Sequence, residues 1–334
     1  MRKVEIAVLL LLFVSCAKKA PPPSPDRWSP RLRGVEAVNR RHLKTLFSES
    51  VDPKSSVDLS NYSCFESITS VPLQILAATM RNSREIDLTT SNQSDISYTL
   101  VVTGIEDLSG NEMNLQKMKF LGSKLLDTHP PQIVRVHPRD GSADVQADSA
   151  VVIRFSEVMD SISILKSWGF LPEGHLKIEW DDELIEFRFF PEKLKAGQVY
   201  CLYLTDGCRD LEGNRLEEWS FLTFTSDSVL PQGYVSGYLR SQERGKTMIA
   251  LVDSVLRILR IAVLSDSTYR IGWLKPANYT LLAGTDLDDD RKFDLVAHAE
   301  VKIGEEGVIA DLFFKKEEER WRIFERLETI FAVD

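Results

Sequence analysis

The chain has 334 residues, of which 43% are hydrophobic and 27% charged, and its formal net charge is −9. This is the composition of a globular protein, and the length suits two or three domains. The basic residues are scattered along the sequence rather than gathered in a stripe, so we expect no nucleic-acid partner.

The N-terminus has the pattern of a secretory signal. A positive start, Arg2 and Lys3, precedes a mostly apolar stretch over residues 4–14 that is too short to span a bilayer permanently. The stretch ends in FVSC, which resembles a bacterial lipobox, and this resemblance implies lipidation of Cys16. We predict a lipoprotein signal peptide over 1–16 and a membrane partner through that anchor. An ordinary signal peptide with an incidental cysteine is the alternative.

The residues that follow favour a tether. Residues 17–30, AKKAPPPSPDRWSP, contain five prolines and little apolar material, so they favour an extended polyproline conformation and cannot pack a core. Ala17 rather than an aspartate follows the cysteine, and the lipoprotein resemblance then implies the outer membrane or the cell surface rather than the inner membrane.

One sequence pattern occurs twice. FSESVD at 47–52 recurs as FSEVMD at 155–160, and YTLVVTGIEDLSGNEM at 98–113 corresponds to YCLYLTDGCRDLEGNRL at 200–216. Both copies contain Phe-Ser-Glu, then Tyr-x-Leu, then Asp-Leu-x-Gly-Asn, at nearly equal spacing. The order and spacing predict a tandem domain duplication.

Each copy has the pattern of a β-sandwich. Apolar residues alternate along short segments separated by turn residues, which predicts antiparallel strands. Phe47 and Phe155 are expected in the two cores, with the following Ser-Glu in a loop. A catalytic serine–glutamate pair is disfavoured because no histidine lies at a repeated position. The residues expected on one strand face are Tyr98, Leu100 and Val102 in the first copy and Tyr200, Leu202 and Leu204 in the second.

The second copy, residues 127–227, resembles the bacterial Ig-like domain of S-layer-type surface proteins. Residues 31–126 are a divergent copy that lacks the Pro-x-Asp-Gly opening. The resemblance implies an extracytoplasmic sandwich used as a spacer or binding module, without a shared active site. The residues that carry it are Pro138, Asp140, Gly141, Phe155–Glu157, Pro191, Tyr200, Asp210–Asn214 and Phe224.

Residues 232–314 form a different unit. The stretch YRIGWLKPANYTLL resembles a transthyretin-like or carboxypeptidase-regulatory-like sandwich, in which a Leu-x-Pro-Gly turn joins two strands. Here Ala277 and Asn278 replace the glycine, and Asn278 is expected to supply the left-handed turn residue. The fold class is therefore all-β, with tandem Ig-like sandwiches and a third small sandwich.

The C-terminal residues 315–334 favour a helix. Trp321, Phe324, Leu327 and Phe331 recur at helical spacing among many charges. The helix is expected to pack on the last domain, and a helix that docks a partner is the alternative.

The cysteines and histidines point to no covalent or copper site. Cys201 and Cys208 are expected along one strand, where seven residues span roughly 23 Å, whereas a disulfide needs Cα atoms within about 7 Å. We predict no disulfide, and Cys64 has no evident partner. A copper site is disfavoured because the five histidines are scattered singles: His42, His129, His137, His175 and His298.

An acidic stretch, DLDDDRKFD, raises the question of calcium. Its spacing matches positions 1, 3, 5 and 9 of a calcium loop, but Arg291 and Ala297 stand where an EF-hand needs glycine and glutamate. A looser calcium site is one reading, and a solvated hairpin turn without any cofactor is the other. The candidate ligands are Asp286, Asp288, Asp290 and Asp294.

Three classes of function follow. The leading one is a non-enzymatic cell-envelope lipoprotein that presents Ig-like modules as a spacer or interaction scaffold. The second is a module that binds a polysaccharide or a surface protein, with Trp168, Trp180 and Trp219 as candidate contacts. The third, an enzyme or an accessory part of one, lacks a convergent set of acid, base and nucleophile.

Overall fold

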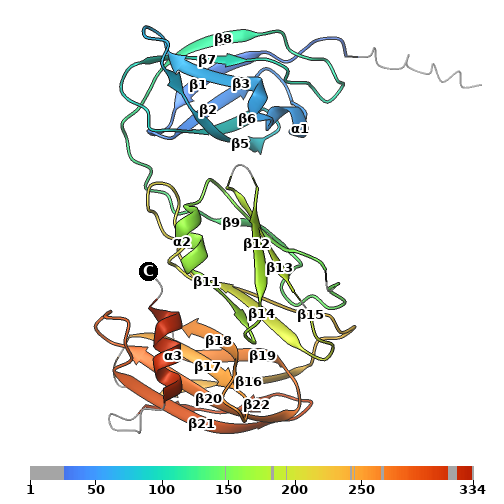
Figure 1. The fold of residues 1–334 in the computed structure, drawn as a ribbon, viewed down its shortest axis with the longest axis vertical. Helices are drawn as coiled ribbons and strands as arrows, with labels where there is room; N and C mark the ends of the chain where they lie inside the picture. The colour runs from blue at the N-terminus through green and yellow to red at the C-terminus, as the bar shows by residue number, and fades with distance from the viewer. Residues whose placement is uncertain are drawn as a thin grey trace, which may run out of the picture.

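The computed structural model describes residues 26–332 except 147, 182–183, 193, 241–242, 244, 265–266 and 315–321. Three β-sandwiches follow one another along the long axis of the molecule, and a short helix lies beside the last (Figure 1). The predicted all-β fold with a C-terminal helix is confirmed. No helix among the described residues is long and apolar enough to cross a membrane.

The first sandwich consists of two four-stranded antiparallel sheets around one core. Phe47 is 2% exposed in that core, as the sequence predicts. Two short helices, α1 (Pro53–Ser56) and the 3₁₀ helix η1 (Leu59–Asn61), follow the Phe-Ser-Glu segment. The sheets are β1 (Leu32–Ala37), β2 (His42–Phe47), β6 (Glu85–Thr90) and β5 (Ile75–Asn82), and β4 (Pro72–Leu73), β3 (Tyr62–Glu66), β7 (Ser97–Val102) and β8 (Gln116–Leu121).

The second sandwich has a four-stranded and a three-stranded antiparallel sheet. Phe155 is 1% exposed and contacts Phe187 edge to face in its core. Helix α2 (Ser161–Lys166) follows the Phe-Ser-Glu segment, at the place of α1 in the first copy. The sheets are β12 (Leu176–Trp180), β13 (Glu186–Pro191), β10 (Val151–Phe155) and β9 (Ile133–His137), and β11 (Trp168–Leu171), β14 (Val199–Leu204) and β15 (Ser220–Thr225).

The third sandwich differs from the other two in topology. Its β16 strand pairs antiparallel with β19 and parallel with the two short strands near the C-terminus. The sheets are β19 (Thr268–Leu274), β16 (Gly233–Arg240), β22 (Val308–Ile309) and β23 (Leu312–Phe313), and β18 (Ile258–Leu264), β17 (Lys246–Val252), β20 (Ala277–Asp286) and β21 (Leu295–Ile303).

The turn between β19 and β20 differs from the sequence expectation. Strand β20 already begins at Ala277, so Asn278 lies in the strand, and the residue with positive φ is Trp273 at 56°. The expected left-handed turn at Asn278 is wrong. Lys275 and Pro276 alone connect the strands, and the hydroxyl of Tyr279 donates to the carbonyl of Lys275 at 2.8 Å.

Helix α3 (Arg322–Phe331) packs on the sheet that contains β17 and β18 (Figure 1). Its apolar residues recur every three or four positions and therefore lie on one face. Trp321, which belongs to the same predicted pattern, lies outside the described residues. The buried residues of the helix are Ile323, Phe324, Leu327 and Phe331.

Strand β14 is buried on both of its faces. Tyr200, Leu202 and Leu204 point into the core of the second sandwich, as the alternation predicts. Cys201 and Tyr203 point the other way and join an apolar cluster with β17, β18 and helix α3. The second and third sandwiches therefore share an apolar cluster at their junction, called here the shared core, which is separate from the core inside each sandwich.

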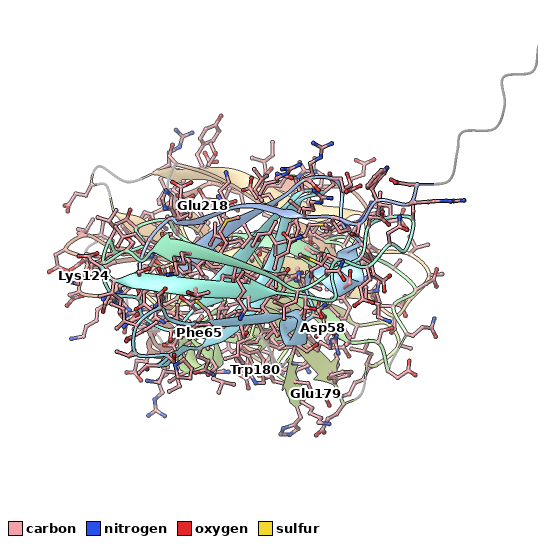
Figure 2. The ribbon with its side chains drawn as sticks, turned by 90° about the horizontal axis from the view of Figure 1, so that it is seen from above. Asp58, Phe65, Lys124, Glu179, Trp180 and Glu218 are labelled. Carbon is pink, nitrogen blue, oxygen red and sulfur yellow. The ribbon has the colours of Figure 1, made fainter. Side chains whose placement is uncertain are left out.

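The rim of the stack is polar. Seen along the long axis, charged side chains such as Lys124 and Glu179 project outward from the sheets (Figure 2). Trp180, on the edge strand β12, is half-buried and contacts the ring of Phe187 at a centroid distance of 3.7 Å.

We expect the shared core to make the second sandwich depend on the third. Each large apolar side chain that loses its burial costs about 1.5–3 kcal/mol, and fragment 127–227 would expose Leu171 and Tyr203. Fragment 127–332 should therefore unfold in urea in a single transition, at a higher midpoint than fragment 127–227. Two separate transitions in the longer fragment, one of them at the midpoint of the shorter, would contradict the shared core.

Candidate functional sites at the domain junctions

Each of the first two sandwiches holds its leading segment in the same way. The leading segments are residues 26–31 and 127–132, and both contain an Asp-x-x-x-Pro pattern. The side-chain amide of Asn111 donates to the carbonyl of Asp26 at 3.2 Å, and that of Asn214 donates to the carbonyl of Asp127 at 3.1 Å. Residues 26–30, expected in the tether, thus lie against the first sandwich.

The asparagine amides are positioned by the repeated Asp-Leu-x-Gly-Asn turns. In the second copy, Asp210 Oδ1 accepts hydrogen bonds from the backbone N–H groups of Glu212 and Asn214, and its Oδ2 accepts one from the Asn214 side chain at 2.7 Å. The turn glycines, Gly110 and Gly213, have φ angles of 80° and 89°, a region that glycine enters without strain. The Asp-Leu-x-Gly-Asn pattern therefore occurs in both copies because its aspartate, glycine and asparagine are needed to form the turn.

The serine of each Phe-Ser-Glu segment also holds the leading segment, and together with the asparagine it forms what is called here the clamp. The N–H of Ser48 donates to the carbonyl of Arg31 at 2.8 Å, and the Ser48 Oγ accepts from the Arg31 N–H at 3.0 Å. Ser156 makes the same two bonds with Gln132 at the same distances. Both hydroxyl groups thus accept from the backbone of the leading segment, and each also donates to the glutamate that follows it.

The glutamate of each Phe-Ser-Glu segment lies close to two aspartates. Ligand oxygens of Asp26, Glu49 and Asp107 lie within 4.8 Å of one another in the first sandwich. In the second, burial and the charges of the nearby Asp210 and Asp127 raise the pKa of Glu157. Each sandwich therefore carries a carboxylate corner where its leading segment begins.

The carboxylate corner of the second sandwich is closed by the first. Arg40 donates from Nε to both carboxylate oxygens of Glu212, at 2.9 and 2.8 Å, and Arg41 also bonds this carboxylate. His42, at the start of β2, places Nε2 at 3.5 Å from Asp127 Oδ2 and 3.7 Å from Glu157 Oε2. The loop at residues 40–42 thus docks onto the acidic corner by charge.

The burial of this junction changes the acidities of its members. Burial, together with the charges of Asp210 and Asp127, raises the pKa of Glu157 to about 7. Burial lowers the pKa of His42, but its hydrogen bond to Asp87 and the nearby carboxylates outweigh burial, so the pKa is raised overall. An apolar contact of Ala77 with Val158 and Ile185 adjoins these groups.

The sequence reasoning missed His42, Asp127 and Glu157. Two signals were available: the Asp-x-x-x-Pro pattern recurs at 26–30 and 127–131, and the glutamates recur in both Phe-Ser-Glu segments. The histidine has no repeated counterpart, because it comes from the neighbouring sandwich rather than from the same one.

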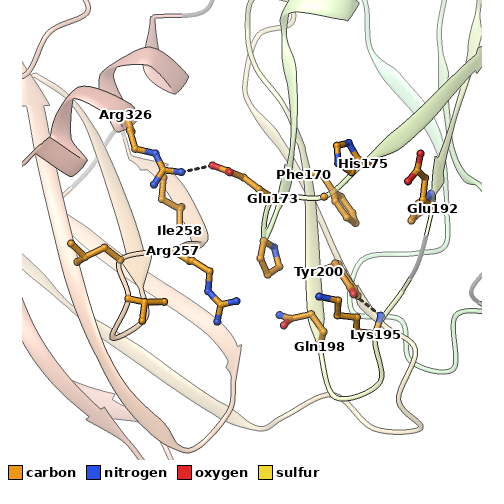
Figure 3. Close-up of a pocket in the computed structure, with 15 residues that line it drawn as sticks. Phe170, Glu173, His175, Glu192, Lys195, Gln198, Tyr200, Arg257, Ile258 and Arg326 are labelled. Atoms are coloured by element: carbon orange, nitrogen blue, oxygen red, sulfur yellow. Dashed lines mark hydrogen bonds and ion pairs between the residues drawn. The ribbon is translucent and has the colours of Figure 1, made fainter.

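A second candidate site lies between the second and third sandwiches. A cavity of about 600 Å³ is lined by both, and an ion pair between Glu173 and Arg326 of α3 crosses it (Figure 3). Arg257 points in from the third sandwich, while His175 and Glu192 lie on the wall formed by the second. Its mixture of charged and apolar groups suits a polar ligand with an apolar part.

The acidic stretch at 286–294 forms the turn between β20 and β21. Asp286, Asp288 and Asp290 have oxygens within 4.8 Å of one another, and Asp294 is not part of this group. Asp286 already accepts hydrogen bonds from two backbone N–H groups of the turn, and Asp294 accepts one from Leu287 at 2.8 Å. The carboxylates therefore serve the turn itself, and calcium binding stays a prediction.

The cysteines lie in separate environments. Cys201 faces the shared core and Cys208 faces the core of the second sandwich. The expectation that both lie along one strand is wrong, because β14 ends at Leu204 and a turn precedes Cys208. The absence of a disulfide stays a prediction. Cys64 is buried in the first core, and the predicted lipidation site, Cys16, lies outside the described residues.

The three candidate tryptophans pack against other aromatic rings. Trp168 contacts Phe189, and Trp180 contacts Phe187. Trp219 stacks on Tyr203 and contacts Phe331 of α3 at a centroid distance of 6.5 Å. These contacts give the tryptophans a packing role rather than forming an exposed aromatic strip.

One comparison with known proteins identifies the family of the second sandwich. A family model described as the bacterial Ig-like domain matches residues 127–225, which confirms the resemblance of the second copy. A comparison with curated proteins found no match.

Several solved structures are similar at low identity. The N-terminal part of the bacterial S-layer protein SbsC is 15% identical and has a TM-score of 0.28, with 59% of this chain and 44% of that chain covered. The structure of domains 1–6 of SbsC is 11% identical and has a TM-score of 0.29, with 85% of this chain and 41% of that chain covered. A fragment of Escherichia coli alpha-2-macroglobulin is 11% identical and has a TM-score of 0.23, with 82% of this chain and 96% of that chain covered. This chain spans less than half of the two S-layer structures.

Loss of the asparagine clamp should destabilise the sandwich that contains it. Asn214→Ala removes the hydrogen bonds to Asp127 and Asp210 and leaves their oxygens unsatisfied. We expect a loss of about 1–3 kcal/mol in the free energy of unfolding, measured by urea denaturation. The exposed Asn278→Ala is the control and should change that free energy by less than about 0.5 kcal/mol. Equal effects of the two substitutions would show that the clamp contributes nothing.

Calcium, if it binds the 286–294 turn, should raise the melting temperature of fragment 127–332 because it would bind only the folded state. Asp288→Ala and Asp290→Ala should abolish the rise. These two aspartates are exposed, so their replacement leaves the backbone hydrogen bonds of Asp286 in place. Identical melting curves in calcium and in chelator would leave only the acidic turn.

Proposed function

We propose that this chain, in which residues 127–225 form a bacterial Ig-like domain, is a non-enzymatic lipoprotein of the cell envelope that acts as a spacer or interaction scaffold. One observation carries the proposal: three sandwiches follow one another end to end, and both junctions between them are packed (Figure 1). Such a stack spaces its two ends apart along the long axis of the molecule.

The order of the units along the chain supports the proposal. The predicted lipid anchor and the proline-rich tether precede residue 26, and the first sandwich begins there. The third sandwich and α3 would then lie at the end far from the membrane. A body held in this way presents its outer domains to partners in the envelope or at the cell surface.

The environment of the repeated serines argues against catalysis. Ser48 and Ser156 occupy the positions at which a serine–glutamate pair would act, but each hydroxyl accepts a hydrogen bond from the backbone of its leading segment. Each hydroxyl also donates to the carboxylate of the next residue, Glu49 at 3.3 Å and Glu157 at 3.4 Å, so it is held by hydrogen bonds on both sides. The serines therefore support a structural role.

Binding of a polysaccharide or surface protein is the second candidate function. The cavity between the second and third sandwiches favours it, since it combines Phe170 with charged side chains from both sandwiches (Figure 3). A ligand in this cavity would contact two sandwiches whose relative position is already fixed by their shared core.

The anchoring part of the proposal is tested by fractionation of cells. Cys16→Ser should move the protein from the membrane fraction to the soluble fraction, because the acyl chains of the anchor would be lost. Cys64→Ala, which changes a buried cysteine of the first core, is the matched control and should stay with the membrane. Retention of the Cys16→Ser protein in the membrane fraction would refute the lipid anchor.

A further inference from the structure

The junction between the first and second sandwiches holds a histidine in a defined orientation. His42 Nδ1 lies 3.0 Å from Asp87 Oδ2, and Arg81 holds the same oxygen at 2.7 Å. In a neutral ring, a carboxylate at Nδ1 favours the proton on that nitrogen and leaves Nε2 as the ligand atom. The same arrangement orients histidines that bind metal ions in proteins.

Two carboxylates face this nitrogen, and each has one oxygen to spare. Asp127 Oδ1 accepts a hydrogen bond from the His129 N–H, while its Oδ2 lies 3.5 Å from His42 Nε2. Glu157 Oε1 lies 3.4 Å from the Ser156 hydroxyl, while its Oε2 lies 3.7 Å from His42 Nε2. The spare oxygens and Nε2 all lie within 4.8 Å of one another.

The distances suit a shared metal ion better than direct hydrogen bonds. An N–H···O bond joins atoms about 2.7–3.2 Å apart, so both contacts to Nε2 are too long. Two ligands of a tetrahedral zinc ion, each about 2.0–2.1 Å from the metal, lie roughly 3.3 Å apart. The two distances from Nε2, 3.5 and 3.7 Å, exceed that separation by only a few tenths of an ångström.

Charge and burial favour the same conclusion. His42, Asp127 and Glu157 are 7%, 8% and 8% exposed, so their charges are largely removed from water. The nearby arginines have carboxylate partners elsewhere, because Arg40 and Arg41 bind Glu212 and Arg81 binds Asp87. Two buried carboxylates that face one imidazole form a site whose net charge a divalent cation would offset.

We propose that His42, Asp127 and Glu157 form a zinc-type metal site that ties the first sandwich to the second, with Asp87 as the positioning residue for the histidine. One imidazole and two carboxylates suit a transition metal, whereas calcium takes oxygen ligands alone. The adjoining cavity of about 440 Å³, which these residues line, gives the ion access and leaves room for water as a fourth ligand.

The first sandwich provides an internal comparison. Its own corner contains Asp26, Glu49 and Asp107 at the corresponding positions, but all three offer only oxygen. The nitrogen ligand at the second corner comes from the first sandwich across the junction. The proposed site therefore exists only when the two sandwiches are docked.

The test is a calorimetric titration of the full chain carrying Cys16→Ser, stripped with a chelator and titrated separately with Zn²⁺ and Ca²⁺. We expect one saturable Zn²⁺ site that excess Ca²⁺ does not occupy. His42→Gln should weaken Zn²⁺ binding by at least about tenfold, since loss of even an orienting partner costs 10–100-fold. His129→Gln is the matched control, because the exposed His129 contacts the same Asp127 carboxylate.

Three results would overturn the site: no one-to-one Zn²⁺ binding, binding unchanged by His42→Gln, or equal binding of Ca²⁺. If His42→Gln does not fold, Glu157→Gln keeps the side-chain shape and replaces it. In that case Co²⁺ is the probe, and a tetrahedral Co²⁺ absorption band in the parent protein that is lost in Glu157→Gln supports the site. A spectrum without that band, or one that Glu157→Gln leaves unchanged, rejects it. Both measurements use soluble protein, so they do not depend on the lipid anchor.

Discussion

The hydrogen bond from the side-chain amide of Asn214 to the carbonyl of Asp127 is the constraint on which the junction between the first two sandwiches depends. It fixes where the chain enters the second sandwich, and Ser156 then pairs with the backbone of Gln132. As a result the Asp127 and Glu157 carboxylates converge at one corner. The loop at residues 40–42 can dock only because that corner is assembled. The same set of bonds around Asn111 holds the first sandwich, which explains why the pattern occurs twice.

The two junctions of the molecule are built from opposite chemistry. The first joins charged and titratable groups around a small apolar contact at Ala77. The second continues the hydrophobic core through Cys201 and Tyr203 on the outer face of β14. The sequences of the two copies record this difference. β14 reads VYCLYL and is buried at every position, whereas β7 reads SYTLVV and begins with an exposed serine.

Much of the fold could be predicted from local patterns, and the sites could not. Alternation placed Tyr200, Leu202 and Leu204 on the core face, and the repeat placed Phe47 and Phe155 in equivalent cores. These features depend on the period of a strand, which the sequence expresses directly. The approach of His42 to Glu157 depends on how two separate sandwiches dock, and no local period encodes that. The turn at Asn278 failed for a smaller reason: the sequence pattern indicated a turn, but not which residue would adopt the positive φ.

The contrast between the junctions also determines how the molecule would respond to a pull along its long axis. The second and third sandwiches share a buried apolar cluster, so we expect tension to pass through them without separating them. The first junction has only a small apolar contact and rests mainly on ion pairs of residues 40–42 with the second sandwich. We expect the first junction to open first and to act as a hinge. Tension on the outer end would then bend the stack before any sheet unfolds. Reclosure would then require only that residues 40–42 find the acidic corner again, which long-range attraction between opposite charges speeds up.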